Sequence, residues 1–210
     1  MAKSSGNSDF ASFKDLPATC LDYQTVVQLV WQPFVIYFAL AAMATFLYFA
    51  YGSNMLVQRL RDRTPSASVV GVGHVVGRRL AFHKVSTDGS GKCDIEATGV
   101  TTDQAYGVLF SIEASEKTKL DRAEGVGNGY DAQEIDVYRP DGSAVRATTY
   151  VATAVERAML PYHWYKALVL AGAIEHDLPS AYVEWIRTFH SQQDPNTERR
   201  AKNEALLFRS

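Results

Sequence analysis

The sequence has few of the residues, and none of the spacings, on which several common functions depend. It holds only two cysteines, Cys20 and Cys93, so a disulfide framework is excluded and a reducing, cytoplasmic setting is predicted. The five histidines show no metal-ligand spacing. Basic residues form no cluster and the formal net charge is −2, so nucleic acid is not an expected partner.

Signatures for nucleotide binding and for serine hydrolysis are missing as well. Gly71, Gly73 and Gly77 resemble a dinucleotide fingerprint, but the last spacing is one residue too long and the run follows a strand pattern. A nucleophile elbow needs glycine two residues before and after the serine, and Ser53 has tyrosine and methionine there. Both classes of enzyme are therefore disfavoured.

One long apolar run lies near the start of the chain. Residues 26–50 approach the length of a membrane span, but Gln28, Gln32 and Pro33 interrupt the first half. A small-residue motif near the end of the run suits a signal peptide, whereas the region before it carries aspartates and no basic cluster. An N-terminal extension is favoured, and a signal, a packed helix or membrane contact by residues 26–44 stays open.

The rest of the chain alternates short strand-like segments with turns and then ends in helical segments. Strands are predicted over residues 46–51, 68–76, 79–83, 104–112, 134–138 and 144–151, and helices over 55–63, 116–123, 162–176 and 179–189. Strands in succession with helices mostly at one end indicate the α+β class. The predicted organisation is an extension over 1–44, one domain over 45–190 and a polar tail over 191–210.

The first predicted strand runs into the turn Gly52-Ser53-Asn54, after which a helix is expected from Met55. Glycine can take a positive φ, which lets consecutive N–H groups point into one concavity. A helix N-terminus would add unpaired N–H groups, and together these can bind a carboxylate or a developing oxyanion. The same three residue types are also common in ordinary turns, so the tripeptide alone favours that simpler interpretation.

The segment FLYFAYGSNML, residues 46–56, resembles the signature of the γ-glutamylcyclotransferase family, which opens its domain with a Tyr-Gly-Ser-Asn loop. Residues 120–126 are similar to the segment that holds the family's catalytic glutamate, and residues 161–166 begin a stretch similar to its C-terminal helical region. The order agrees, so the resemblance spans 46–189, with a poor match over 84–101. It implies a compact mixed β-barrel with flanking helices.

The resemblance also implies which residues form the site. The loop that would bind the glutamyl group comprises Tyr48, Phe49, Ala50, Tyr51, Gly52 and Ser53. Glu124 matches the catalytic residue, and Tyr165 matches a tyrosine that contacts the substrate. Tyr130 is a further candidate for the pocket wall, and Glu113 is a second candidate for the base.

The implied activity is cyclisation of a γ-glutamyl-amino acid or γ-glutamyl amine to 5-oxoproline plus the free amine, a reaction linked to glutathione metabolism. The substrate's own amine is the nucleophile, so no cofactor and no metal is expected. One carboxylate can carry the proton from the attacking to the departing nitrogen. Glu124 stands at the predicted C-terminal end of a helix, where the helix dipole disfavours the ionised form.

The expected partner is a small γ-glutamyl substrate, and a homodimer stays open. Two alternatives also remain: a non-catalytic binding protein with the cyclotransferase fold, and a cyclotransferase that acts on a γ-glutamylated biosynthetic intermediate.

Overall fold

The structure is a computed structural model that describes residues 44–208. Residues 26–43 of the apolar run, and with them the alternatives of signal, anchor or packed helix, lie outside the described residues. Within residues 44–208, no helix has both the length and the apolar character that crossing a bilayer requires.

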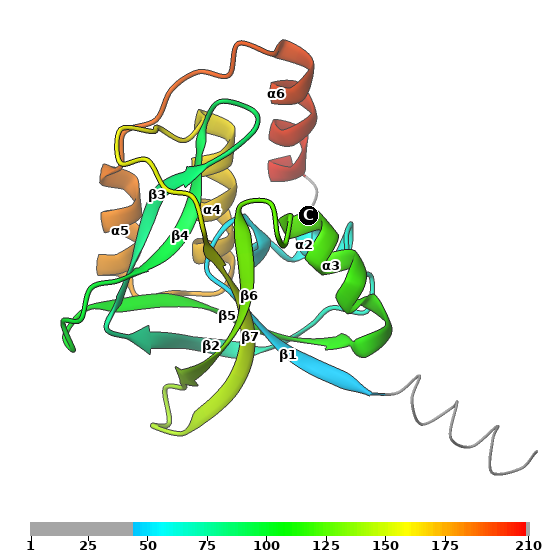
Figure 1. Ribbon diagram of the computed structural model, residues 1–210, viewed down its shortest axis with the longest axis vertical. Helices are drawn as coiled ribbons and strands as arrows, with labels where there is room; N and C mark the ends of the chain where they lie inside the picture. Colours follow the sequence, from blue (N-terminus) through cyan, green and yellow to red (C-terminus); the bar gives the residue numbers. More distant parts are fainter. Residues whose placement is uncertain (1–43, 209–210) are drawn as a thin grey trace, which may run out of the picture. The chain divides into compact units, whose positions relative to one another are not determined.

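Five strands form a closed barrel in the order β1-β5-β2-β6-β7, and β3 and β4 form a separate two-stranded sheet (Figure 1). The strands are β1 Thr45–Ala50, β2 Ser68–Val76, β3 Arg78–Val85, β4 Gly91–Ala97, β5 Gln104–Glu113, β6 Tyr130–Tyr138 and β7 Ala144–Ala152. Pairing is antiparallel except between β1 and β7, which meet in parallel at Tyr48 and Thr148. Between β2 and β6 the barrel closes through one pair, His74 and Tyr138, whose rings stack.

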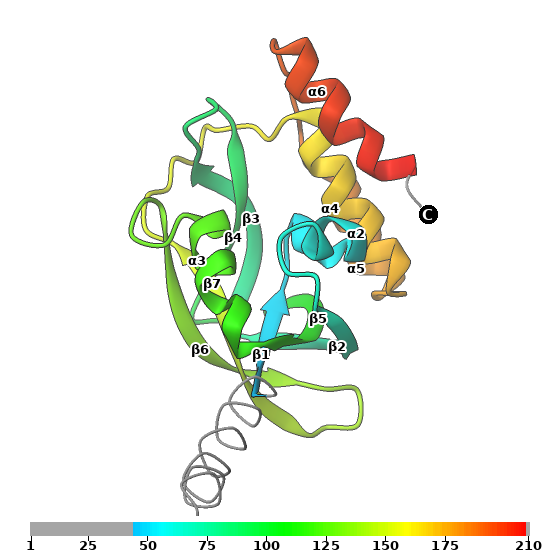
Figure 2. The same ribbon diagram turned by 90° about the vertical axis from the view of Figure 1, so that its right-hand side faces the viewer.

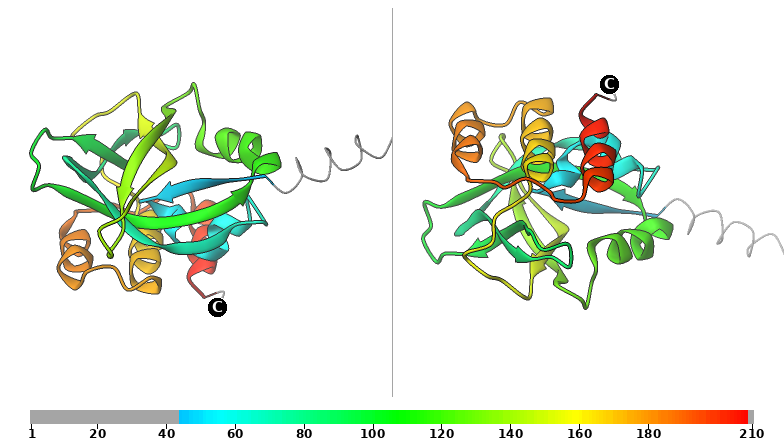
Figure 3. Two further views of the ribbon diagram at one scale, coloured as in Figure 1. Left: turned by 90° about the horizontal axis from the view of Figure 1, so that it is seen from below. Right: turned by 90° about the horizontal axis from the view of Figure 1, so that it is seen from above.

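The helices gather mainly on one side of the barrel. They are α2 Val57–Arg61, α3 Lys117–Glu124, α4 His163–Glu175, α5 Ser180–Thr188 and α6 Thr197–Glu204, with 3-10 turns at Ser53–Met55, Ala114–Glu116 and Ala205–Phe208. Helices α4, α5 and α6 lie side by side, while α3 lies apart from them (Figures 2 and 3). Because the sheet and the helices each bury an apolar face, Phe49, Phe110 and Leu168 are fully buried in the core.

The predicted α+β class and mixed barrel are confirmed. Some element boundaries differ from the prediction. The helix expected over 55–63 is divided into a 3-10 turn at Ser53–Met55 and a short α2 that begins at Val57. Strand β4 was not predicted, because residues 88–91 signal only a turn. Helix α6 lies in the segment predicted to be a polar tail.

Helix α6 is held to the rest of the domain by Asp194, whose side chain is fully buried. The carboxylate accepts hydrogen bonds from Trp164 Nε1 at 2.8 Å and from Arg199 Nε and Nη2 at 2.7 and 2.6 Å. The hydrogen bonds from the Arg199 guanidinium hold the pKa of Asp194 well below its usual range. The polar tail is therefore part of the folded domain.

The turn that follows β1 rests against α4 at Gly172. A Cβ at this position would lie 2.6 Å from the Leu56 amide nitrogen and 2.7 Å from Met55 Cβ. Backbone atoms cannot give way as a flexible side chain can, so only glycine allows this close approach.

We expect Gly172→Ala to lower the free energy of unfolding by about 1–3 kcal/mol, because overpacking outweighs the better helix propensity of alanine. Ile174→Ala, on the same helix but 49% exposed, is the matched control. It should change stability by no more than about 0.5 kcal/mol. Urea denaturation measures both, and equal stability of Gly172→Ala and the parent protein would contradict the assigned contact.

Asp194 should make stability depend on pH. Because its pKa in the folded state is lowered, its stabilising contribution is complete above the unfolded value of about 4 and is lost as the pH falls further. Thermal midpoints of the parent protein and Asp194→Asn should therefore differ most near neutral pH and converge in acid. A difference that stays constant across this range would show that the carboxylate charge is not the cause.

Candidate active site

A narrow cavity lies where β1 ends, and it collects side chains from strands and helices far apart in sequence. Its lining residues are Tyr48, Tyr51, Gly52, Ser53, Asn54, Cys93, Glu124, Tyr130, Tyr150 and Tyr165. The volume is ≈ 30 Å³, enough for about two water molecules at roughly 10–15 Å³ each. A larger ligand therefore has to displace lining side chains as it enters.

Gly52 is required here for space and not for a positive φ. Its φ is −112°, so the predicted left-handed conformation is wrong. A Cβ on Gly52 would lie 3.0 Å from Cys93 Cβ and 3.5 Å from the Tyr165 hydroxyl oxygen. The α-helix N-terminus expected at Met55 is also wrong, because a 3-10 turn follows Gly52 and α2 begins at Val57.

Glu124 lies at the C-terminal end of α3, which Gly125 ends in the left-handed conformation with φ 73°, as predicted. Glu124 Oε1 accepts a hydrogen bond from Asn54 Nδ2 at 2.8 Å and forms an ion pair with Arg63 Nη1 at 2.5 Å. The same Asn54 amide donates to the Tyr48 hydroxyl at 3.0 Å, and its Oδ1 accepts from Arg63 at 2.9 Å. Asn54 thus connects the turn after β1 to the carboxylate.

The ion pair changes the electrostatics expected from sequence. The helix end disfavours a charged carboxylate, whereas the guanidinium of Arg63 stabilises one by direct contact. The side chain of Arg63 is 25% exposed and that of Glu124 is 15% exposed, so the ion pair borders the solvent. The Glu124 carboxylate is thereby fixed beside the turn.

The other titratable lining groups are neutral hydroxyls and one thiol. Burial is the main cause that raises the pKa of Tyr48, and the negative charge of Glu124 raises it further. Burial likewise raises the pKa of each remaining tyrosine and of the thiol: Tyr51, Tyr130, Tyr150, Tyr165 and Cys93. Glu124 is the one carboxylate among the described residues that line the cavity.

Strand β4 forms one wall through the backbone of Cys93. The Cys93 N–H donates to the Tyr165 hydroxyl oxygen at 3.2 Å, and its carbonyl accepts from the Tyr130 hydroxyl at 2.5 Å. The Tyr51 hydroxyl donates to the Tyr150 carbonyl, and the Tyr150 hydroxyl donates to Asp121 at 2.7 Å. These bonds fix the phenols around the cavity.

The turn is also supported from the tail of the chain. Ser53 Oγ accepts from Arg59 Nε at 3.0 Å, and Arg59 Nη1 donates to Asn203 Oδ1, on α6, at 3.1 Å. Burial, with Arg63 nearby, lowers the pKa of Arg59 to about 10. Helix α6 therefore reaches the cavity through a single arginine.

The structure brings together most, but not all, of the residues predicted for the site. The residues that line the cavity as predicted are Tyr48, Tyr51, Gly52, Ser53, Glu124, Tyr130 and Tyr165. Phe49 and Ala50 are completely buried in the core and do not line it, and Glu113 is exposed at the end of β5. Sequence reasoning missed Arg63, Cys93 and Tyr150, since strand and helix patterns do not tell which distant residue meets Glu124.

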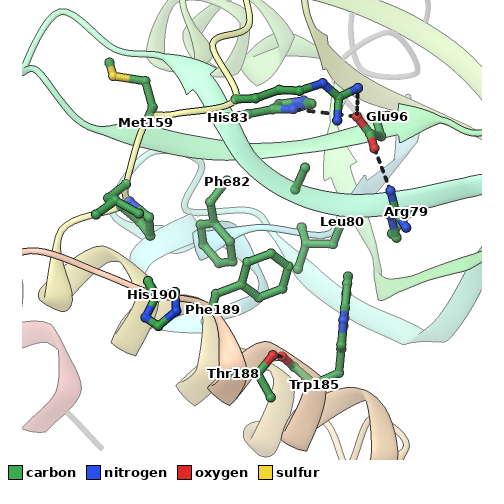
Figure 4. A pocket seen from close by; sticks show the side chains of 14 residues that line it. Arg79, Leu80, Phe82, His83, Glu96, Met159, Trp185, Thr188, Phe189 and His190 are labelled. Carbon is green, nitrogen blue, oxygen red and sulfur yellow. Dashed lines mark hydrogen bonds and ion pairs between the residues drawn. The ribbon is translucent and has the colours of Figure 1, made fainter.

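A second, larger groove of ≈ 430 Å³ shares no lining residue with this cavity. Figure 4 shows its floor, where the rings of Phe82 and Phe189 meet, and its rim, where Glu96 contacts Arg79. Arg157 also pairs with Glu96, at 3.3 Å. Two arginines therefore bind this carboxylate, and His83 lies 3.6 Å from it.

Comparison with known proteins identifies relatives of the whole domain. Residues 104–186 match the AIG2-like family. The chain is 33% identical over 156 residues to a γ-glutamylcyclotransferase of Mus musculus, covering 71% of this chain and 81% of that protein. It is 33% identical over 153 residues to a γ-glutamylcyclotransferase of Homo sapiens, covering 68% and 78%.

A solved structure described as γ-glutamyl cyclotransferase superposes with a TM-score of 0.71 at 28% identity, covering 80% of this chain and 100% of that chain. The barrel and its one-carboxylate cavity therefore define an enzyme of the cyclotransferase class. The chain belongs to the γ-glutamylcyclotransferase family. The alternative of a non-catalytic binding protein is set aside.

We expect Arg63→Met to reduce cyclotransferase turnover by about 10-fold or more, because Glu124 loses the guanidinium that holds its carboxylate in place. Arg122→Met is the matched control, since Arg122 is an exposed arginine of the same helix as Glu124. It should leave turnover nearly unchanged. Circular dichroism confirms folding, and full turnover in folded Arg63→Met would show that the ion pair is dispensable.

Proposed function

We propose that this enzyme converts a γ-glutamyl-amino acid or γ-glutamyl amine into 5-oxoproline and the free amine. The observation that carries the proposal is the placement of Glu124, the one carboxylate of the cavity, 2.8 Å from Asn54 in the turn after β1. The names of the relatives support the same reaction class.

The reaction needs little from the protein besides geometry and proton transfer. The α-amino nitrogen of the substrate attacks its own γ-carbonyl carbon, and the new C–N bond closes a five-membered lactam. Well-oriented intramolecular attack can supply about 7–11 kcal/mol of the barrier reduction. Holding the glutamyl group curled, against the turn formed by Ser53 and Asn54, is therefore the main task.

Glu124 completes the proton balance. As a carboxylate it takes the proton that the attacking nitrogen loses, and it returns that proton to the departing nitrogen when the original C–N bond breaks. Its ion pair with Arg63 and its hydrogen bond from Asn54 hold the carboxylate in place for this transfer. The hydroxyl oxygens of Tyr48 and Tyr165 accept hydrogen bonds from Asn54 and Cys93, so their O–H groups can donate to the oxygen of the γ-carbonyl as negative charge develops on it.

The test is release of 5-oxoproline from a panel of γ-glutamyl dipeptides and γ-glutamyl amines. Glu124→Gln should remain folded and lose turnover by about 10²–10⁴-fold, the usual contribution of a general base. Glu113→Gln is the matched control, because Glu113 was the other carboxylate considered and lies outside the cavity.

Turnover of Glu113→Gln should stay at the parent level. Undiminished activity of Glu124→Gln would end the assignment of the base. The panel also tests the alternative that the substrate is a γ-glutamylated biosynthetic intermediate. An enzyme specific for such an intermediate should turn over the simple dipeptides poorly.

A further inference from the structure

Lys84 is a buried cation without an anionic partner. Only 9% of the residue is exposed, and within residues 44–208 its ammonium group makes no hydrogen bond or ion pair. Its Nζ lies over the ring of Tyr130, 4.8 Å from the centroid. Lys92, in contrast, donates to Asp88 and to Ser90, each at 2.7 Å. Buried lysines are normally paired, so Lys84 requires an explanation.

Two features of the local structure determine where the Lys84 side chain lies. The pairing of β3 with β4 shifts register between Ala81 and Lys84, and such irregularities redirect a side chain. On the facing loop, a Cβ on Gly129 would lie 2.7 Å from Lys84 Cε and 2.8 Å from Nζ. A larger residue at position 129 would therefore displace the ammonium group.

Lys84 does not itself line the cavity, but it contacts a residue that does. The ring under Lys84 belongs to Tyr130, which lines the cavity, and residues 125–129 link Glu124 to it. Burial lowers the pKa of Lys84, and the negative charge of Glu124 opposes that effect. Lys84 and Glu124 are thus close enough to interact electrostatically, although they form no ion pair.

The chemistry of the leaving group indicates what Lys84 could bind. Glu124 has to reach the departing nitrogen of the leaving group. When the leaving group is an α-amino acid, its carboxylate carbon is two bonds from that nitrogen, roughly 2.5 Å with ordinary bond lengths. A carboxylate on the leaving group would therefore lie close to the negative charge of Glu124 and would need a cation. Arg63 already binds Glu124 and Asn54, whereas Lys84 has no partner in the described residues.

We propose that Lys84 binds the carboxylate of the leaving amino acid of a γ-glutamyl-amino acid substrate. This inference rests on the function proposed above. It makes Lys84 a specificity-determining residue, separate from the proton carrier Glu124 and from the turn that holds the glutamyl half.

The experiment compares γ-glutamylalanine with γ-glutamylethylamide, which differ only by the carboxylate. Lys84→Met keeps an unbranched apolar side chain and removes the charge. We expect kcat/KM for γ-glutamylalanine to fall about 10-fold or more, mainly through KM, and that for the ethylamide to change less than about 2-fold. Lys84→Arg should restore part of the loss. Lys119→Met replaces a side chain that is 65% exposed, and it should leave kcat/KM unchanged for both substrates.

An equal fall for both substrates would overturn the inference, because Lys84 would then serve the glutamyl half or the fold. Unchanged kinetics with γ-glutamylalanine would also overturn it. If the parent protein released no 5-oxoproline from either compound, the proposed function would fail instead. Calorimetric binding of γ-glutamylalanine to the parent protein and to Lys84→Met would then still decide the role of Lys84, with weaker binding expected for the variant and equal binding contradicting it.

Discussion

The contact between Glu124 and Asn54 is the interaction on which the site depends. It joins the end of α3 to the turn after β1 across 70 residues of sequence. A glycine positions each element: Gly125 ends α3 directly after Glu124, and Gly172 allows α4 to pack closely against the turn. The barrel therefore matters to function chiefly because it brings these two ends within hydrogen-bonding distance.

Sequence reasoning succeeded where the signal is local. The turn after β1, the end of α3 at Gly125 and the hairpin of β6 and β7 all follow from short patterns of apolar residues and glycine. It failed where a residue acts through a distant partner. Arg63 sits in an ordinary amphipathic segment, and nothing local shows that its guanidinium meets Glu124. Gly52 was assigned the wrong property, since close approach and positive φ both favour glycine.

Composition was similarly misleading for the end of the chain. A segment rich in charged and amide residues predicts a solvated tail, yet Asp194 is buried because Arg199 and Trp164 satisfy it. The helix that follows reaches Arg59 and through it Ser53. Polar residues can therefore build functional architecture when each finds a partner, and hydropathy alone does not reveal those partners.

The single pair that joins β2 to β6 has a consequence for how the barrel comes apart. Every other neighbouring pair of barrel strands except β1 and β7 shares a longer ladder of backbone bonds. The line through His74 and Tyr138 is held more by stacked rings than by the backbone. Local opening follows the least bonded parts of a fold, so this line is a natural seam. The hairpin of β6 and β7, which carries Tyr130 and Tyr150, is thus joined to the rest of the barrel by one pair at each of its two edges.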